Sequence, residues 1–183
     1  MVHHRSREEL ESGLDEIAEA PKDHGRLEAI IVRPEHNERK PVNSIELSPE
    51  HGVKGDHWAK GCWKTLADGS PDPDVQVCIM SARVIRLLAG DKVYWPPAGD
   101  QLFVDLDLSR SNLEPGQRLT LGSAVIEITA VPHNGCNKFI ERYGLAATQF
   151  VNSKFGKENR FRGIYAKVID AGKISVGDVV EKI

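Results

Sequence analysis

The chain is poor in cysteine. Its 183 residues include only three, Cys62, Cys78 and Cys136, at wide spacings. An odd number of widely spaced thiols builds no disulfide framework and does not supply the four thiolates of an iron-sulfur cluster or a structural zinc site. We therefore expect no iron-sulfur cluster within this chain, and any redox chemistry needs electrons from another protein.

Long hydrophobic runs are also missing. No apolar stretch is long enough to span a bilayer, and residues 1–6 lack the hydrophobic core of a signal peptide. The default expectation is a cytoplasmic protein without membrane contact. The formal net charge is −3, and the lysines and arginines are spread along the chain, which argues against binding to nucleic acid. A small molecule is the expected substrate.

The composition is that of a globular domain, with 40% hydrophobic and 28% charged residues. Ser6 and Glu9 form a capping box, and apolar residues follow at helical spacing as far as Pro21. This pattern predicts an amphipathic helix over 6–20, which docks on the domain or on a second subunit in a homodimer. We place a helical extension and linker at 1–25 and one domain at 26–183.

Short β-like runs separated by turn residues dominate from Arg26 onward. They predict strands at 27–32, 44–47, 75–80, 102–106, 119–121, 124–131, 164–169 and 179–183. Helices are expected at 82–88, after the N-cap Ser81, at 137–143 and at 145–154. Many short strands with few helices predict a mainly β (α+β) fold, either a barrel or a sandwich.

Cys136 is the first candidate for chemistry. It lies between the strand at 124–131, a turn containing Pro132, His133 and Gly135, and a helix. A helix N-terminus and a nearby Lys138 or His133 favour the thiolate, which attacks electrophiles and binds metals. The alternative is a small buried core residue, because free cysteine is often buried.

A second candidate is the glycine-flanked turn at 52–58, which presents Lys54, Asp56 and His57. Its glycines allow close approach of a ligand, and its cations are suited to an anion such as phosphate, although no P-loop pattern is present. A tight hairpin in which Asp56 bonds its own backbone is the alternative. His57 and Cys62 lack the further ligands of a zinc site.

Two arginines precede the strand expected at 164–169. Guanidinium groups such as those of Arg160 and Arg162 bind phosphate or carboxylate in a bidentate fork, and surface ion pairing explains them equally well. Cys78, inside a short apolar strand, is assigned to the core.

The ordered set of segments resembles the MOSC domain, named for the C-terminal part of molybdenum cofactor sulfurases. The resemblance covers nearly all of 26–183. The matching segments are 52–56, 99–108, Asn112-Leu113 with Pro115-Gly116, 126–129, Pro132-His133 with Gly135-Cys136 and Lys138-Phe139, 162–166 and 177–180. One departure is at 57–58, where His57 and Trp58 stand in place of the arginine and histidine that members often carry.

The resemblance implies a MOSC-type β-barrel and a molybdenum cofactor (molybdopterin), with Cys136 as the molybdenum ligand or as a persulfide carrier. Both roles suit an accessible thiolate. It also implies a cofactor pocket lined by Asn112, His133, Arg162 and the turn with Lys54, Asp56 and His57, where Arg162 and Lys54 meet the pterin phosphate. No pyridoxal phosphate is expected within the chain. The partner is then an electron-transfer reductase, if N-hydroxylated substrates are reduced, or a cysteine desulfurase, if sulfur is carried.

Overall fold

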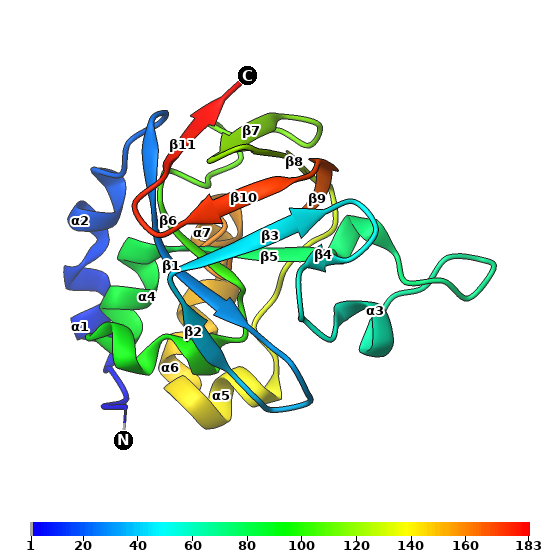
Figure 1. Cartoon of the computed structure of the whole chain (residues 1–183). Helices are drawn as coiled ribbons and strands as arrows, with labels where there is room; N and C mark the ends of the chain where they lie inside the picture. Colours follow the sequence, from blue (N-terminus) through cyan, green and yellow to red (C-terminus); the bar gives the residue numbers. More distant parts are fainter. Residues whose placement is uncertain (1) are drawn as a thin grey trace.

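Seven strands form a closed barrel in the computed structural model, which describes residues 2–183 (Figure 1). They follow one another in the order β11-β7-β8-β9-β5-β6-β1, and β1 pairs back with β11. Every pairing is antiparallel except that of β5 with β6. The ring consists of β1 (Gly25–Val32), β5 (Val77–Ser81), β6 (Leu102–Asp105), β7 (Arg118–Leu121), β8 (Ala124–Ile128), β9 (Ile164–Asp170) and β11 (Val179–Lys182). The mainly β barrel expected from the sequence is confirmed.

Four further strands lie outside the ring. β2 (Lys40–Val42) extends the edge of β1, and β10 (Gly172–Ser175), β3 (Ser44–Ser48) and β4 (Gly52–Val53) form a second sheet. The barrel interior is filled by aliphatic side chains such as Leu27, Ile79 and Ile126, each at most 1% exposed. In β8 buried and half-buried residues alternate, as the period of a strand with one face on a core requires.

The helices cover the outside of the barrel. They are α1 (Arg7–Ser12), α2 (Leu14–Ala18), α3 (Trp58–Gly61), α4 (Ala82–Ala89), α5 (Asn137–Tyr143), α6 (Leu145–Asn152) and α7 (Lys154–Glu158), with 3-10 turns at Pro73–Val75, Lys92–Tyr94 and Pro96–Ala98. A second hydrophobic core fills the space between them and the barrel wall, with Leu10, Met80 and Phe103 completely buried in it. The N-terminal helices therefore pack on the same body as the barrel, beside α6 and α4 (Figure 1).

Several expected elements differ in extent. The predicted helix at 6–20 is broken at Gly13, where a Cβ would lie 2.4 Å from a methyl carbon of Leu87. Because α4 lies so close to Gly13, the segment forms two short helices, α1 and α2, in place of one continuous helix. The strand expected at 75–80 begins only at Val77, after a 3-10 turn, and the one expected at 124–131 ends at Ile128. The helix expected at 145–154 ends at Asn152, because Ser153 caps α7 instead.

A long loop between α3 and β5 projects from the body (Figure 1). Trp63 in this loop is 68% exposed. Within residues 2–183 no helix combines the length and apolar character of a membrane span.

Candidate functional site

Cys136 lies at the surface, at the start of α5. It is the N-cap residue of that helix and is exposed, whereas Cys62 is half-buried and Cys78 is buried. The turn before it is held by Asn152 of α6, which accepts from the backbone N–H of Gly135 at 2.9 Å and donates to its carbonyl oxygen at 3.0 Å. The thiol therefore stands accessible on a turn that is fixed to the neighbouring helix.

A buried ion pair lies beside this helix. Arg162, just before β9, donates through Nη1 to both carboxylate oxygens of Asp100, at 3.0 and 2.7 Å, and through Nη2 to the carbonyl oxygen of Ala98. Asp100 is completely buried. The guanidinium of Arg162 stacks over the ring of Phe139, 4.9 Å from its centroid, and Phe139 is in the first turn of α5. Arg162 and Cys136 are thereby brought to the same part of the molecule.

His133 is the third member of this group. Its side chain is 8% exposed, and Nδ1 lies 3.6 Å from the carboxylate of Asp100. Burial, with the charges of Arg162 and Arg33, holds the pKa of His133 well below 6.5. The imidazole is therefore neutral at physiological pH. Burial raises the pKa of Asp100, and the guanidinium of Arg162 opposes that shift.

A second buried pair adjoins the first. Arg33, which follows β1, binds Asp56 in a fork, with Nε to Oδ2 at 2.8 Å and Nη2 to Oδ1 at 2.9 Å, and its Nη1 donates to the carbonyl oxygen of Gly99. His57 Nδ1 lies 2.6 Å from the carbonyl oxygen of Arg33. Cys78 lies 3.8 Å from the same guanidinium, and burial raises the pKa of this thiol to about 11.

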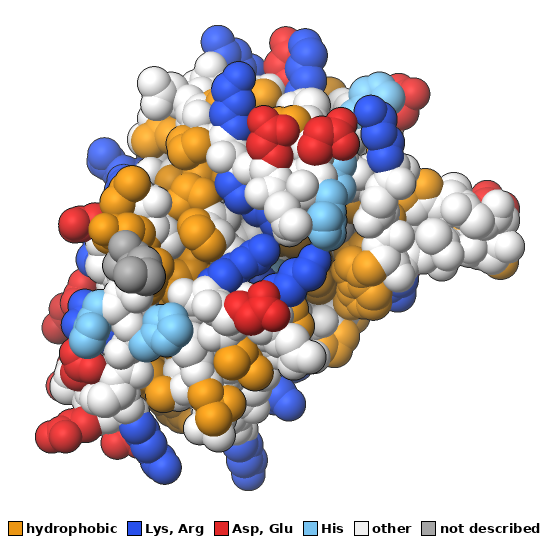
Figure 2. All heavy atoms as spheres, turned by 90° about the horizontal axis from the view of Figure 1, so that it is seen from below, with side chains coloured by type: hydrophobic (Ala, Val, Ile, Leu, Met, Phe, Trp, Pro, Cys, Tyr) orange, Lys and Arg blue, Asp and Glu red, His pale blue; other side chains and the backbone are white. Residues whose placement is uncertain are grey.

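Two further guanidinium groups approach Gly99. A Cβ at this glycine would lie 3.8 Å from both Arg39 Nη2 and Arg142 Nη1. Burial and the charges of Arg33 and Arg142 lower the pKa of Arg39. We call Arg33, Arg39, Arg142 and Arg162 the arginine cluster. Only two of its members have a carboxylate partner within residues 2–183, so two positive charges stay unpaired. Figure 2 shows the molecule from below, relative to the view of Figure 1. This face is hollowed, and Lys and Arg side chains gather across its middle.

Hydrogen-bonding atoms without a partner concentrate here. Four buried side-chain nitrogens in the described part of the chain lack one: Nε of Arg39, Nε of Arg162, Nδ1 of His133 and Nε1 of Trp58. Two of these nitrogens belong to the arginine cluster. The other two belong to Trp58, whose backbone N–H donates to Asp56, and to His133, which lies beside Asp100. A buried polar atom without a partner costs free energy, so these four nitrogens are available to bind a ligand or a water molecule.

An aromatic row connects this region to solvent. The ring of His133 lies 4.3 Å from that of Tyr165, and Tyr165 lies 6.4 Å from Trp63 on the projecting loop. Of the three rings only that of Trp63 is exposed, because Tyr165 is 7% exposed and the side chain of His133 8%.

The structure brings together Asp56, His57, His133 and Arg162 from among the residues predicted for the cofactor pocket, and it separates Lys54 and Asn112 from them. Lys54 is 69% exposed and pairs with Glu46 on the outer sheet. Asn112 joins the linker to the barrel, because it donates to the carbonyl oxygens of Lys22 and Asp107. Asp56 accepts a hydrogen bond from the backbone N–H of Trp58, as expected for a tight hairpin, and it also accepts from the guanidinium of Arg33.

Sequence reasoning missed most of the arginine cluster and gave Asp100 no role. Arg33, Arg39 and Arg142 share no spacing that a motif could reveal. The one local signal is the position of Arg33 directly after a buried strand. No group of three or more His, Cys, Asp or Glu side chains within 2–183 is arranged to hold a metal ion.

Comparison with known proteins identifies the family. A family model described as MOSC domain matches residues 72–181, which is more than half of the chain. The chain belongs to the MOSC domain family. The matched MOSC segment includes Asp100, His133, Cys136 and Arg162, and MOSC domains are associated with the molybdenum cofactor. Curated proteins give no significant sequence match.

Solved structures agree with the MOSC fold. The YuaD protein from Bacillus subtilis superposes with a TM-score of 0.64 at 18% identity, covering 86% of this chain and 94% of that one. YiiM from Escherichia coli gives a TM-score of 0.56 at 19% identity, covering 86% and 69%. YiiM from Geobacillus stearothermophilus gives 0.57 at 16%, covering 87% and 75%. At these identities the likeness concerns the fold.

Proposed function

We propose that this MOSC protein binds the molybdenum cofactor through Cys136 and the arginine cluster, and reduces N-hydroxylated small molecules with electrons from a separate reductase. The observation that carries the proposal is the position of Cys136, the only exposed thiol within residues 2–183, at the start of the helix whose first turn supports Arg162. A thiolate is a suitable ligand for the soft molybdenum centre.

The residues of the site fit the cofactor chemically. Molybdopterin has a pterin ring with hydrogen-bonding edges and a phosphate. The unpaired Nε of Arg162 is suited to the pterin edges, and Arg39 and Arg142, which lack carboxylate partners, are suited to the phosphate. Asp56 and Asp100 act through Arg33 and Arg162, whose orientation they determine. Lys54 and Asn112 have no part in this proposal.

Reduction of an N-hydroxyl group to an amine consumes two electrons and two protons and releases water. The bound cofactor supplies a metal centre that changes oxidation state and so passes on the electrons. From this chain, we assign the movement of a proton to His133, whose imidazole is neutral and whose Nδ1 is free of hydrogen bonds in the described structure.

A carrier function is the second candidate, favoured by the exposure of Cys136 at the surface. In this function a cysteine desulfurase transfers sulfur to the thiolate as a persulfide, which a second protein then takes. No turnover of a small molecule takes place.

Metal analysis tests the proposed ligand. Protein purified from a cofactor-producing host should contain molybdenum, and Cys136→Ala should lose it. Cys62→Ala is the matched control and should keep the metal, because Cys62 is half-buried and its thiol donates to the carbonyl oxygen of Lys64. Equal molybdenum in wild type and Cys136→Ala would remove Cys136 as the ligand.

Activity separates the two functions. A metal-loaded reductase should consume an N-hydroxylated purine or an amidoxime with an artificial reductant. Loaded protein without activity, together with a persulfide mass increment confined to Cys136 after incubation with a desulfurase, would favour the carrier.

A further inference from the structure

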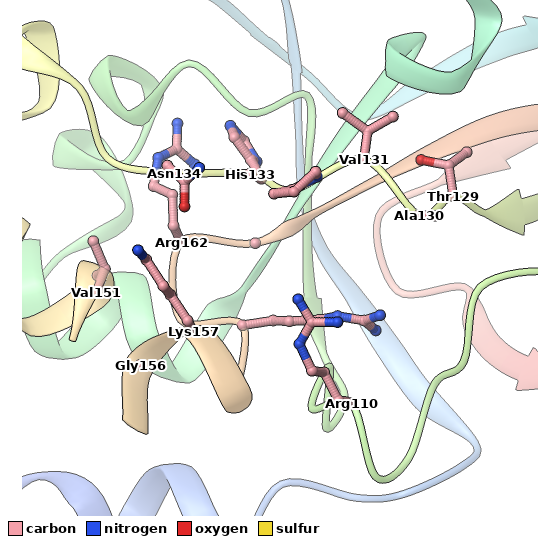
Figure 3. A pocket seen from close by; sticks show the side chains of 13 residues that line it. Arg110, Thr129, Ala130, Val131, His133, Asn134, Val151, Gly156, Lys157 and Arg162 are labelled. Atoms are coloured by element: carbon pink, nitrogen blue, oxygen red, sulfur yellow. The ribbon is translucent and has the colours of Figure 1, made fainter. Parts of the chain in front are cut away.

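A second basic site lies on the other side of the segment at 129–134. It is a cavity of about 310 Å³, bounded by that segment on one side and by α7 and the turn after it on the other (Figure 3). Arg110, Lys157 and Arg160 line it, and its lining includes no Asp or Glu. We call these three residues and their cavity the basic pocket.

The basic pocket is distinct from the arginine cluster. The side chains of His133, on the segment at 129–134, and of Arg162, which precedes β9, point away from Arg110 (Figure 3), and the guanidinium of Arg162 is engaged with Asp100. The stems of His133 and Arg162 therefore form part of the cavity wall, while their polar ends serve the other site.

The charges in the pocket repel one another. Arg160 is half-buried, and burial together with the charge of Arg110 lowers its pKa. Glu158 acts on Arg160 in the opposite direction without forming an ion pair with it. Arg160 is fixed by donating to the carbonyl oxygens of Leu108 and Leu113.

The other two cations are free to bind. The side chains of Arg110 and Lys157 form no hydrogen bond or ion pair within residues 2–183. Arg110 and Lys157 are exposed, so solvent screens part of their repulsion, and three cations around a concave space with no carboxylate in its lining attract an anion. The volume is at the lower end of the range for ligand pockets, about 300 to 1,000 Å³, so it admits more than a bare anion.

We propose that the basic pocket binds a phosphate monoester, and that this phosphate belongs to the substrate. The first statement needs no metal and does not depend on the proposed function; the second rests on it. Guanidinium and ammonium groups together are the usual partners of phosphate oxygens. The cofactor is a less suitable source of this phosphate, because the polar ends of His133 and Arg162, which carry unpaired nitrogens, point away from Arg110 (Figure 3). The substrate class is then an N-hydroxylated compound that carries a phosphate monoester.

Calorimetric titration of the metal-free full chain with inorganic phosphate, and with adenosine monophosphate against adenosine, tests the anion site. Lys157→Gln and Arg110→Gln should each weaken binding of both phosphates by about tenfold, the effect of one lost charged hydrogen bond. Lys154→Gln, on the same helix but outside the pocket, should bind as wild type does. Absence of phosphate binding at millimolar concentration, or equal affinity in all four proteins, would overturn the proposal.

Cofactor-loaded protein distinguishes the sources of the phosphate. For a substrate phosphate, Lys157→Gln should raise KM for an N-hydroxylated nucleoside monophosphate about tenfold, with no change for the nucleoside or in molybdenum content. Loss of molybdenum in Lys157→Gln would assign the phosphate to the cofactor and overturn the substrate assignment. Cys136→Ala should still bind inorganic phosphate, so failure of the metal proposal and failure of this one give different results.

Discussion

Replacement of Asp100 by asparagine should destabilise the protein strongly. Asp100 is completely buried and accepts two hydrogen bonds from Arg162, whose side chain is 9% exposed. The variant leaves a buried guanidinium without its counter-charge. Breaking a buried pair by removing one partner costs about 3–5 kcal/mol. For a chain of this length the melting temperature should fall by roughly 2–4 °C per kcal/mol, or about 6–20 °C.

Urea unfolding followed by circular dichroism measures the loss. Glu46→Gln is the control, because it breaks the pair with Lys54 in which both side chains are more than 60% exposed. Such a surface pair contributes at most about 1 kcal/mol. If Asp100→Asn costs no more than Glu46→Gln, the assumption that Arg162 depends on Asp100 for its buried position is wrong.

A double variant makes the test sharper. Arg162→Met combined with Asp100→Asn removes both charges and leaves no unpaired ion in the interior. Its cost should be smaller than the sum of the two single costs, because contacting residues are not additive. Additive costs would mean that the two side chains act independently.

Three further predictions concern stability. The pKa of His133 is held well below 6.5 in the folded protein, so below pH 6.5 unfolding of the metal-free protein takes up a proton. The free energy of unfolding of wild type should therefore fall from pH 6.5 downward, by up to about 1.4 kcal/mol per pH unit. Denaturant titrations of His133→Gln should lack this component of the pH dependence. Gly163→Ala should lower the urea midpoint of unfolding more than Gly177→Ala does. Both glycines have positive φ, but only at Gly163 would a Cβ lie 2.3 Å from a carbonyl oxygen. Leu10→Ala should lower the free energy of unfolding by about 2–5 kcal/mol, and a thermal midpoint equal to that of wild type would show that α1 is not part of the core.

The local part of the site was predictable. The turn before Cys136 and the helix after it lie next to each other in the sequence, and proline, glycine and helical spacing mark them; the helix begins at Asn137 as expected. The long strands were predictable for the same reason, whereas β2 and β4 are only three and two residues long and leave little pattern.

The assembled part of the site was not predictable from residue patterns. Arg33, Asp100 and Arg162 come from the ends of three different strands or loops, and they meet only because β1, β6, β5 and β9 are neighbours in the ring. Strand order is a property of the whole barrel. No local spacing indicates it.

Closure of the barrel has a consequence for folding of the protein. The ring is completed by pairing of Gly25 and Arg26 in β1 with Val180 and Val179 in β11. Contacts between such distant segments form late in folding. Until β11 is in place, the edge of β1 that it covers stays unpaired and is open to pairing with another chain.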